Sequence, residues 1–222
     1  MPFLIPFQEA WLLEEIVKVI EMATERYHVN VAYPEYHLSK QPLNTFNVAI
    51  FNKITGYVKE FTDSAGQMAL PNGIKSELQG AHSTYTAVNR FITTKVDFYP
   101  YLGGVHPGHN IVTITFDTAE NAIVSLSDFF AGERNYLQLL SSLTEKALFD
   151  QYPDLDFAFS DPTFRKGFAP AKENFSHWAL SNHGLIIFFP EYQVAPYAAG
   201  ALYITIPYQA IFSGRIFSGS YG

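Results

Sequence analysis

The chain of 222 residues contains no cysteine. This absence excludes a disulfide framework, a thiolate nucleophile, cysteine-ligated zinc and an iron–sulfur cluster. It does not fix the compartment, because an oxidising environment permits disulfides without requiring them.

Charged residues are scarce, at 16% of the chain against a typical ~25%. The 14 Lys and Arg are outnumbered by 21 Asp and Glu, which gives a formal net charge of −7, and the basic residues form no cluster. Phosphate binding needs concentrated positive charge, so we expect no nucleic-acid partner.

Long apolar runs are also missing, since no stretch approaches the roughly 20 apolar residues that a membrane-spanning helix needs. We therefore expect no membrane span. The apolar stretch at residues 1–7 is short and lacks a basic segment before it, so we do not expect it to act as a signal peptide.

Apolar residues make up 48% of the chain, and 16% are aromatic, with 20 Phe, 14 Tyr and 2 Trp. This composition is typical of a globular protein rich in β-structure and large enough to bury its own core.

The first half of the chain mixes helical and strand patterns. Residues 9–26 fit both spacings and predict a short helix or extended arm that gives way to a strand ending at Pro34. Apolar residues at three- and four-residue steps over 46–61 predict the first helix. Residues 66–80 are then expected to form a loop, and residues 85–101 a long β-segment.

In the second half, the run GGVHPGH at 103–109 predicts a shaped loop, because its glycines and proline interrupt any regular structure. A second main helix is expected over 134–152, ended by Pro153, and residues 154–173 are expected to be mostly irregular. Strands are predicted at 111–116, 122–126, 174–180, 185–189 and 202–206.

Several of these segments resemble a known family. They are YLGGVH (101–106), FD (116–117), SLSDFF (125–130), GLIIFFPEYQVAPYAAG (184–200) and ITIPY (204–208). Together they resemble the domain of unknown function found in RsiV-like, lysozyme-sensing anti-sigma-factor ectodomains and beside peptidoglycan deacetylase domains. YHVNVAYP (27–34), followed by a helix with Asn44 and Asn47 near its start, resembles the smaller domain that precedes it. The resemblance spans roughly residues 17–212.

The resemblance implies an α+β fold, with antiparallel strands packed on two main helices. It divides the chain into a smaller N-terminal domain (1–100), with arm, helix and long strand, and an RsiV-like domain (101–222), the two forming one compact unit. It also implies an extracytoplasmic location, in the cell envelope or secreted, with any signal or anchor outside this sequence. No catalysis is implied, since deacetylase activity in this family resides in a separate domain.

His106 and His109 are the sharpest local feature. Two imidazoles on a glycine-rich loop can ligate a divalent metal, with Asp97 or Asp117 as a third ligand, and this is the basis of an alternative hypothesis of a metal-dependent enzyme. The favoured interpretation is that His106 holds a tight turn by bonding the backbone and His109 is incidental. We therefore expect no cofactor, no metal and no catalytic residue; no G-x-S-x-G motif occurs.

Tyrosines on ordered loops supply a better functional argument, because they combine large contact area with little entropy loss. Tyr203 and Tyr208, which lie on or beside a strand, are expected in the core. For Tyr101, Tyr192 and Tyr197, core packing is an open alternative to binding. The predicted binding residues are Tyr101, Gly103, Gly104, His106, Tyr192 and Tyr197.

The sequence thus favours a non-enzymatic binding or sensing module. The expected partner is a lysozyme-type protein or a peptidoglycan fragment, and the acidic balance suits a cationic protein. A purely structural envelope domain is the remaining alternative.

Overall fold

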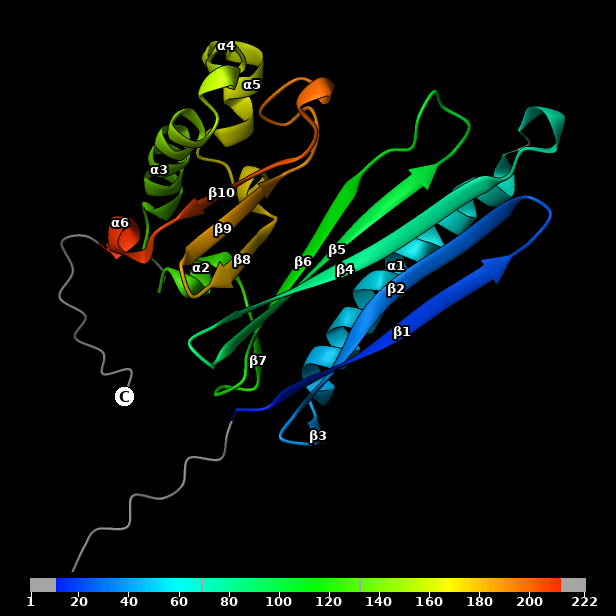
Figure 1. Ribbon diagram of the computed structural model, residues 1–222, viewed down its shortest axis with the longest axis horizontal. Helices are drawn as coiled ribbons and strands as arrows, with labels where there is room; N and C mark the ends of the chain where they lie inside the picture. The colour runs from blue at the N-terminus through cyan, green and yellow to red at the C-terminus, as the bar shows by residue number, and fades with distance from the viewer. Residues whose placement is uncertain (1–10, 69, 132, 213–222) are drawn as a thin grey trace, which may run out of the picture.

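The computed structural model describes residues 11–68, 70–131 and 133–212, and the predictions for residues 1–10 lie outside them. Figure 1 shows an elongated body built on a long sheet and a second body built on a short one. The long sheet and its helix comprise β1 (Leu13–Ala23), β2 (Tyr27–Leu38), β3 (Gln41–Pro42), α1 (Asn44–Gln67), β4 (Ser76–Ala87), β5 (Phe91–Tyr101), β6 (Asn110–Asp117) and β7 (Ala122–Val124).

The second body contains a three-stranded antiparallel sheet in the order β10-β9-β8. Its elements are α2 (Leu126–Phe129), α3 (Tyr136–Gln151), α4 (Asp156–Ser160), α5 (Pro162–Arg165), β8 (Trp178–Ser181), β9 (Gly184–Phe189), β10 (Leu202–Ile206) and α6 (Tyr208–Phe212). Single 3₁₀ turns occupy Pro71–Gly73, Pro153–Leu155, Lys166–Phe168, Lys172–Phe175 and Tyr197–Ala199. The fold is therefore α+β, as the sequence predicted.

The long sheet runs in the order β1-β2-β4-β5-β6-β7, with β3 beside β2. All its pairs are antiparallel except β2 with β4. The sheet extends through β7 to Val124, past the predicted domain boundary at residues 100 and 101. Within the described residues, no helix is long and apolar enough to cross a membrane.

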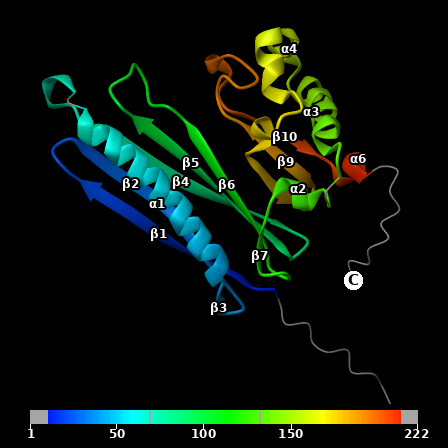
Figure 2. The ribbon, with the colours of Figure 1, turned by 180° about the vertical axis from the view of Figure 1, so that it is seen from behind.

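Helix α1 covers one face of the long sheet, as Figure 2 shows from behind. Its buried stripe falls at helical spacing, as predicted: Phe46, Ile50, Ile54, Val58, Phe61 and Ala65. The Asn47 side chain acts as a local strand partner for β2, because its Oδ1 accepts from the Tyr36 N–H at 2.8 Å and its Nδ2 donates to the Tyr36 carbonyl at 2.9 Å. The asparagine near the helix start thus fixes α1 on the sheet.

The other face of the long sheet meets the edge of the short sheet. Strand β8 hydrogen-bonds to β9 along one side, and on the other side its backbone meets threonine hydroxyls. The Trp178 N–H donates to Thr113 Oγ1 at 3.2 Å, and the Leu180 N–H donates to Thr93 Oγ1 at 3.4 Å. These hydroxyls satisfy backbone donors that an edge strand otherwise leaves unpaired. The two bodies are therefore joined by directional contacts.

Several predicted boundaries were wrong in the first half. The predicted helix or arm over 9–26 is a strand, β1, from Leu13 onward, and β2 continues through Pro34 instead of ending there. Pro34 is tolerated because β4 pairs only with Tyr27–Val31, so no ladder bond is lost on that side. The predicted single segment over 85–101 is a hairpin whose turn contains Val88 and Asn89, both at positive φ.

The second half follows the prediction closely. Strands β6, β9 and β10 and helix α3 lie where expected, within a few residues at each end. The predicted irregular segment over 154–173 instead contains several short helical turns. Strand β8 begins at Trp178 rather than 174, because a 3₁₀ turn occupies Lys172–Phe175.

Candidate functional site

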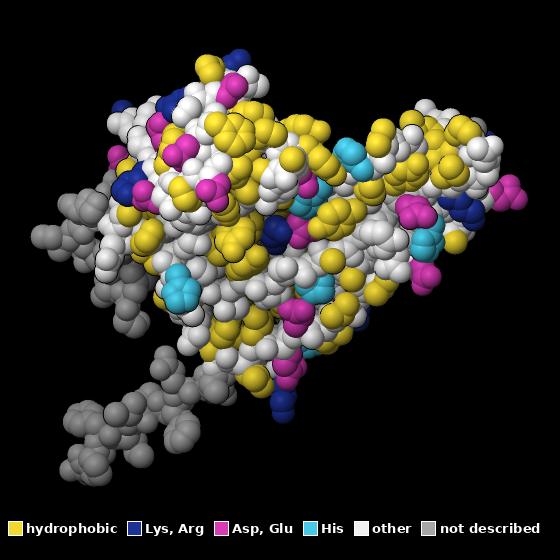
Figure 3. Space-filling view, turned by 45° about the horizontal axis from the view of Figure 1, so that its top comes forward, with side chains coloured by type: hydrophobic (Ala, Val, Ile, Leu, Met, Phe, Trp, Pro, Cys, Tyr) yellow, Lys and Arg dark blue, Asp and Glu magenta, His cyan; other side chains and the backbone are white. Residues whose placement is uncertain are grey.

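Two loops that are far apart in the sequence converge where the two bodies meet. One joins β5 to β6 and contains residues 102–109, and the other joins β9 to β10 and contains residues 190–201. Both were singled out from the sequence, but nothing in the sequence placed them together. Figure 3 shows histidine, acidic and hydrophobic side chains gathered on the face where the elongated body meets the compact one.

Three rings from these loops form a continuous stack. His106 lies on Tyr197 with ring centroids 4.3 Å apart, and Tyr197 lies on Tyr192 at 5.4 Å. The stack remains open to solvent, since Tyr192 is 62% exposed and Tyr197 is 39% exposed. We call His106, Tyr197 and Tyr192 the aromatic stack. Exposed, mutually supported rings are suited to binding a protein surface or a sugar ring.

His109, on the same loop as His106, lies between two carboxylates. Its Nε2 is 2.8 Å from Asp97 Oδ1 and its Nδ1 is 3.0 Å from Glu191 Oε2, while its ring stacks on Tyr99 at 4.9 Å. Lys95 forms an ion pair with the other oxygen of Asp97. The His109 side chain is only 8% exposed. We call Lys95, Asp97, His109 and Glu191 the charged junction, because Glu191 belongs to the second loop, His109 to the first loop, and Lys95 and Asp97 to β5.

The junction shifts the pKa values of its members in opposite directions. The hydrogen bond to Asp97 raises the pKa of His109 above 6.5, and the charge of Glu191 adds to this, while burial opposes it. Burial by itself raises the pKa of Asp97, but the hydrogen bonds from His109 and Lys95 outweigh it and hold that pKa below 3.8. Both shifts favour the charged forms, in which His109 attracts the two carboxylates that face it.

The second loop, residues 190–201, is anchored to the body that is built on the short sheet. Gln193 Nε2 donates to the carbonyls of Gly167 at 2.8 Å and of Asn174 at 3.0 Å. A Cβ at Gly167 would lie 1.8 Å from the Gln193 carbonyl oxygen, so only glycine permits this approach. Val194 and Ala195 are buried in the core beside it. The loop therefore presents Tyr192 and Tyr197 from a fixed base, which lowers the entropy lost on binding.

The remaining predicted site residues shape the first loop. Gly103 has φ +86°, and a Cβ there would lie 2.4 Å from the Leu70 side chain, so this turn requires glycine. Gly104 follows it, and Tyr101 ends β5 and is half-buried. Among the two tyrosines expected in the core, Tyr208 is half-buried and donates to the Ser181 carbonyl at 2.8 Å. Tyr203, however, is 56% exposed.

The two histidines of the predicted metal alternative have different partners. His106 Nδ1 lies 2.9 Å from the Pro107 carbonyl oxygen, consistent with the predicted turn-holding role, whereas both His109 ring nitrogens face carboxylates. Asp117 lies at the other end of β6, paired with Arg90. Across 11–68, 70–131 and 133–212, no three His, Asp or Glu side chains are arranged to hold a metal ion.

Sequence reasoning missed Glu191 and Lys95. It proposed Asp97 only as a third metal ligand beside His106 and His109, and the structure instead places Asp97 in direct contact with His109, 2.8 Å from its Nε2. Glu191 lies 82 positions from His109, so only the fold brings them together. The available clue was that Glu191 is the one charged residue in the quoted segment GLIIFFPEYQVAPYAAG (184–200).

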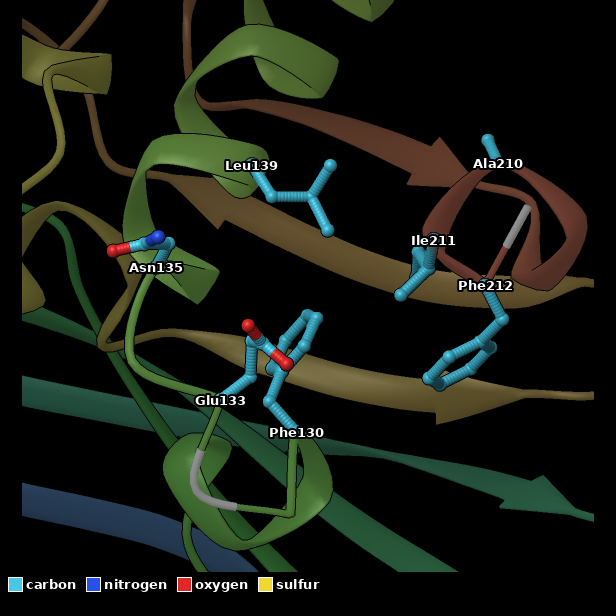
Figure 4. Close-up of a pocket in the computed structure, with 7 residues that line it drawn as sticks. All are labelled: Phe130, Glu133, Asn135, Leu139, Ala210, Ile211 and Phe212. Atoms are coloured by element: carbon cyan, nitrogen blue, oxygen red, sulfur yellow. The ribbon is translucent and has the colours of Figure 1, made fainter. Parts of the chain in front are cut away.

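A separate cavity of about 200 Å³ lies between α3 and α6, as Figure 4 shows. Apolar side chains including Leu139 and Ile211 line it together with Glu133 and Asn135. None of the predicted site residues lies in this cavity.

The comparisons with known proteins agree with an α+β domain of the predicted kind. Residues 127–209 match the model of DUF3298, described as a protein of unknown function. This supports the resemblance to a domain of unknown function, whereas the narrower likeness to lysozyme-sensing anti-sigma factors stays a prediction.

Two curated relatives match parts of the chain. The peptidoglycan-N-acetylmuramic acid deacetylase PdaC of Bacillus subtilis is 34% identical over 97 residues, which is 44% of this chain and 20% of that protein. The immunogenic protein MPT64 of Mycobacterium tuberculosis is 22% identical over 203 residues, covering 87% of this chain and 80% of that protein. The chain thus spans only a fifth of the length of PdaC.

Solved structures share the fold over most of the chain. DUF3298 family proteins from Pseudomonas aeruginosa and Bacteroides fragilis each superpose with a TM-score of 0.59, at 15% and 16% identity. Each comparison covers 90% of this chain, and 92% and 91% of the solved chains. At this identity the likeness concerns the fold alone.

Proposed function

We propose that this chain is a non-enzymatic, extracytoplasmic binding module, and that its ligand is a cell-wall component or a lysozyme-type protein acting on the cell wall. The observation that carries the proposal is the aromatic stack, which two converging loops hold open to solvent. Its base is fixed by the charged junction and by Gly167, so the surface is organised before binding.

Two further observations support the choice of ligand. The matched relative PdaC is named for its action on peptidoglycan, which favours a ligand from the cell wall. The formal net charge of −7 favours attraction of a cationic protein such as a lysozyme. An extracytoplasmic location follows from either ligand.

A binding role, rather than catalysis, is supported by the arrangement around His109. A histidine that serves as a general base needs a free ring nitrogen directed at a nucleophile or substrate. Both ring nitrogens of His109 are instead occupied by carboxylates.

The test is calorimetric titration with two probes, a c-type lysozyme and soluble peptidoglycan fragments, at low and physiological salt. Saturable binding of either probe is expected, with lysozyme binding weakened by salt and fragment binding largely unaffected. Tyr197→Ala and Tyr192→Ala should each weaken binding by about tenfold or more, as expected for exposed aromatic anchors. Tyr101→Ala tests the first loop in the same way.

The matched control is Phe51→Ala, which removes a ring that is 47% exposed on α1, the helix covering the opposite face of the long sheet. It should leave the affinity unchanged. Equal affinity of wild type and both tyrosine variants would remove the aromatic stack from the proposal, and absence of binding to both probes would overturn the proposed ligands.

A further inference from the structure

The charged junction holds one histidine between two carboxylates that come from different bodies of the molecule. Asp97 lies on β5, whereas Glu191 lies in the loop that follows β9. A neutral imidazole carries a single N–H and can donate to only one of them, leaving the other carboxylate facing a lone pair. The observed distances of 2.8 and 3.0 Å on the two ring nitrogens therefore fit the doubly protonated imidazolium.

We propose that protonated His109 fastens the β9–β10 loop to the β5–β6 loop, so that the aromatic stack is assembled while His109 is charged and loosens when it is neutral. The chain of contacts is short. Glu191 and Tyr192 are adjacent in sequence, and Tyr192 stacks on Tyr197, which stacks on His106 of the opposing loop. Loss of the Glu191 contact therefore acts directly on the stack.

Other aromatic and titratable groups surround His109. Tyr99 stacks on the ring from β5, and Lys95 shares Asp97 with it. His106 lies on the same loop in the aromatic stack. His177, which precedes β8, is a further titratable group in the vicinity, and burial lowers its pKa, with Lys53, Lys95 and His109 adding to that effect. The lowered pKa of His177 favours its neutral form, whereas the raised pKa of His109 favours its charged form.

The pH window follows from the two shifted groups. The raised pKa of His109 means that its contribution is complete below about 6.5 and is lost as pH rises through its folded pKa. The lowered pKa of Asp97 means that its contribution is present above 3.8 and is lost as pH falls through its folded pKa. The fastening is thus complete in mildly acidic solution and is released on the alkaline side.

We call the contact between protonated His109 and Glu191 the latch. Its relevance to binding rests on the proposed function, but the latch itself can be tested without any ligand. Ring ¹⁵N NMR of the full chain reports the protonation of both His109 nitrogens across pH 5–9. We expect an imidazolium at pH 6 and a titration above 6.5 that moves down in Glu191→Gln. Amide exchange over residues 190–200 at pH 6 should be about tenfold faster in Glu191→Gln, the size expected for losing one charged hydrogen bond.

Glu191→Gln keeps the shape of the side chain, so it preserves the fold better than removing His109, which would leave two carboxylates facing each other. The control is Glu60→Gln, which removes the same charge from an exposed position on α1 and should change neither readout. A neutral His109 at pH 6, or exchange in Glu191→Gln equal to that of wild type, would overturn the latch. Failure to bind lysozyme or peptidoglycan fragments, with the NMR results as expected, would overturn only the proposed function.

Discussion

The paired strands β5 and β6 are held at their two ends by different ion pairs. At one end, Arg90 donates to both oxygens of Asp117 at 2.9 and 2.7 Å, and at the other end His109 lies between Asp97 and Glu191. Arginine stays charged at every relevant pH, whereas histidine titrates near neutrality. The Arg90–Asp117 ion pair at one end of these strands is therefore independent of pH near neutrality. The ion pairs of His109, at the end that bears the candidate site, depend on its protonation.

The largest effect is expected from Gly167→Ala, because Gly167 packs against Gln193 in the loop that carries Glu191, the partner of His109. The new Cβ would collide with the Gln193 carbonyl oxygen and displace the loop that carries Glu191. We expect the free energy of unfolding to fall by about 2–3 kcal/mol. Urea unfolding measures it.

The control for this change is Gly56→Ala on α1, where a Cβ meets nothing within 4 Å. That variant should be more stable than wild type by about 0.5–1 kcal/mol, because alanine favours the helix. Equal stability of Gly167→Ala and wild type would show that the loop is not anchored as described.

Arg90→Met removes the Arg90–Asp117 ion pair and should lower the free energy of unfolding by about 2 kcal/mol, because Asp117 is nearly buried and loses two charged hydrogen bonds. Burial alone raises the pKa of Asp117, but its bonds from Arg90 and from backbone N–H groups hold it below 3.8. The loss should therefore be the same at pH 6 and pH 9. A loss that varied between these pH values would contradict the contrast between the two ends.

Asp97→Asn removes one of the two carboxylates that face His109 and should lower the free energy of unfolding by about 1–2 kcal/mol at pH 6. Because the pKa of His109 is raised in the folded state, the wild type itself loses stabilisation as pH rises through that pKa. The difference between wild type and variant should therefore shrink on the alkaline side. Denaturation at several pH values measures it, and a difference that grew with pH would reverse the assigned sign.

The smallest effect on stability is expected from Tyr197→Ala, at less than about 1 kcal/mol, because the ring is partly exposed and its contacts are stacking contacts. Thermal unfolding checks this. A loss of stability comparable to that of Gly167→Ala would mean that the ring supports the fold. Weaker binding by Tyr197→Ala would then not identify Tyr197 as a binding residue.

The sequence predicted the periodic elements well and the long-range contacts poorly. The stripe from Phe46 to Phe61 identified α1, because helical spacing is a local property. The hairpin over β4 and β5 was missed because its turn has Val88 and Asn89 at positive φ, and valine is a poor indicator of such a turn. Strand β1 was not predicted, because residues 9–26 fit both helical and strand spacing.

The candidate site divides in the same way. His106, Tyr192 and Tyr197 were identified because Gly and Pro mark their loops, and the structure stacks them together. The pairing of His109 with Glu191 depends on the packing of one body against the other, which no local pattern encodes. Glu191 could therefore be identified as a partner of His109 only from the fold.

The central claim is that the converging loops form a recognition surface, and tyrosine-ring NMR tests it most directly. With ¹³C-labelled tyrosines, addition of a c-type lysozyme or a peptidoglycan fragment at pH 6 should shift the resonances of Tyr192 and Tyr197. Tyr33, which contacts Phe51 of α1, should be unaffected. Shifts confined to tyrosines outside the two loops, or no shift with either probe, would contradict the account.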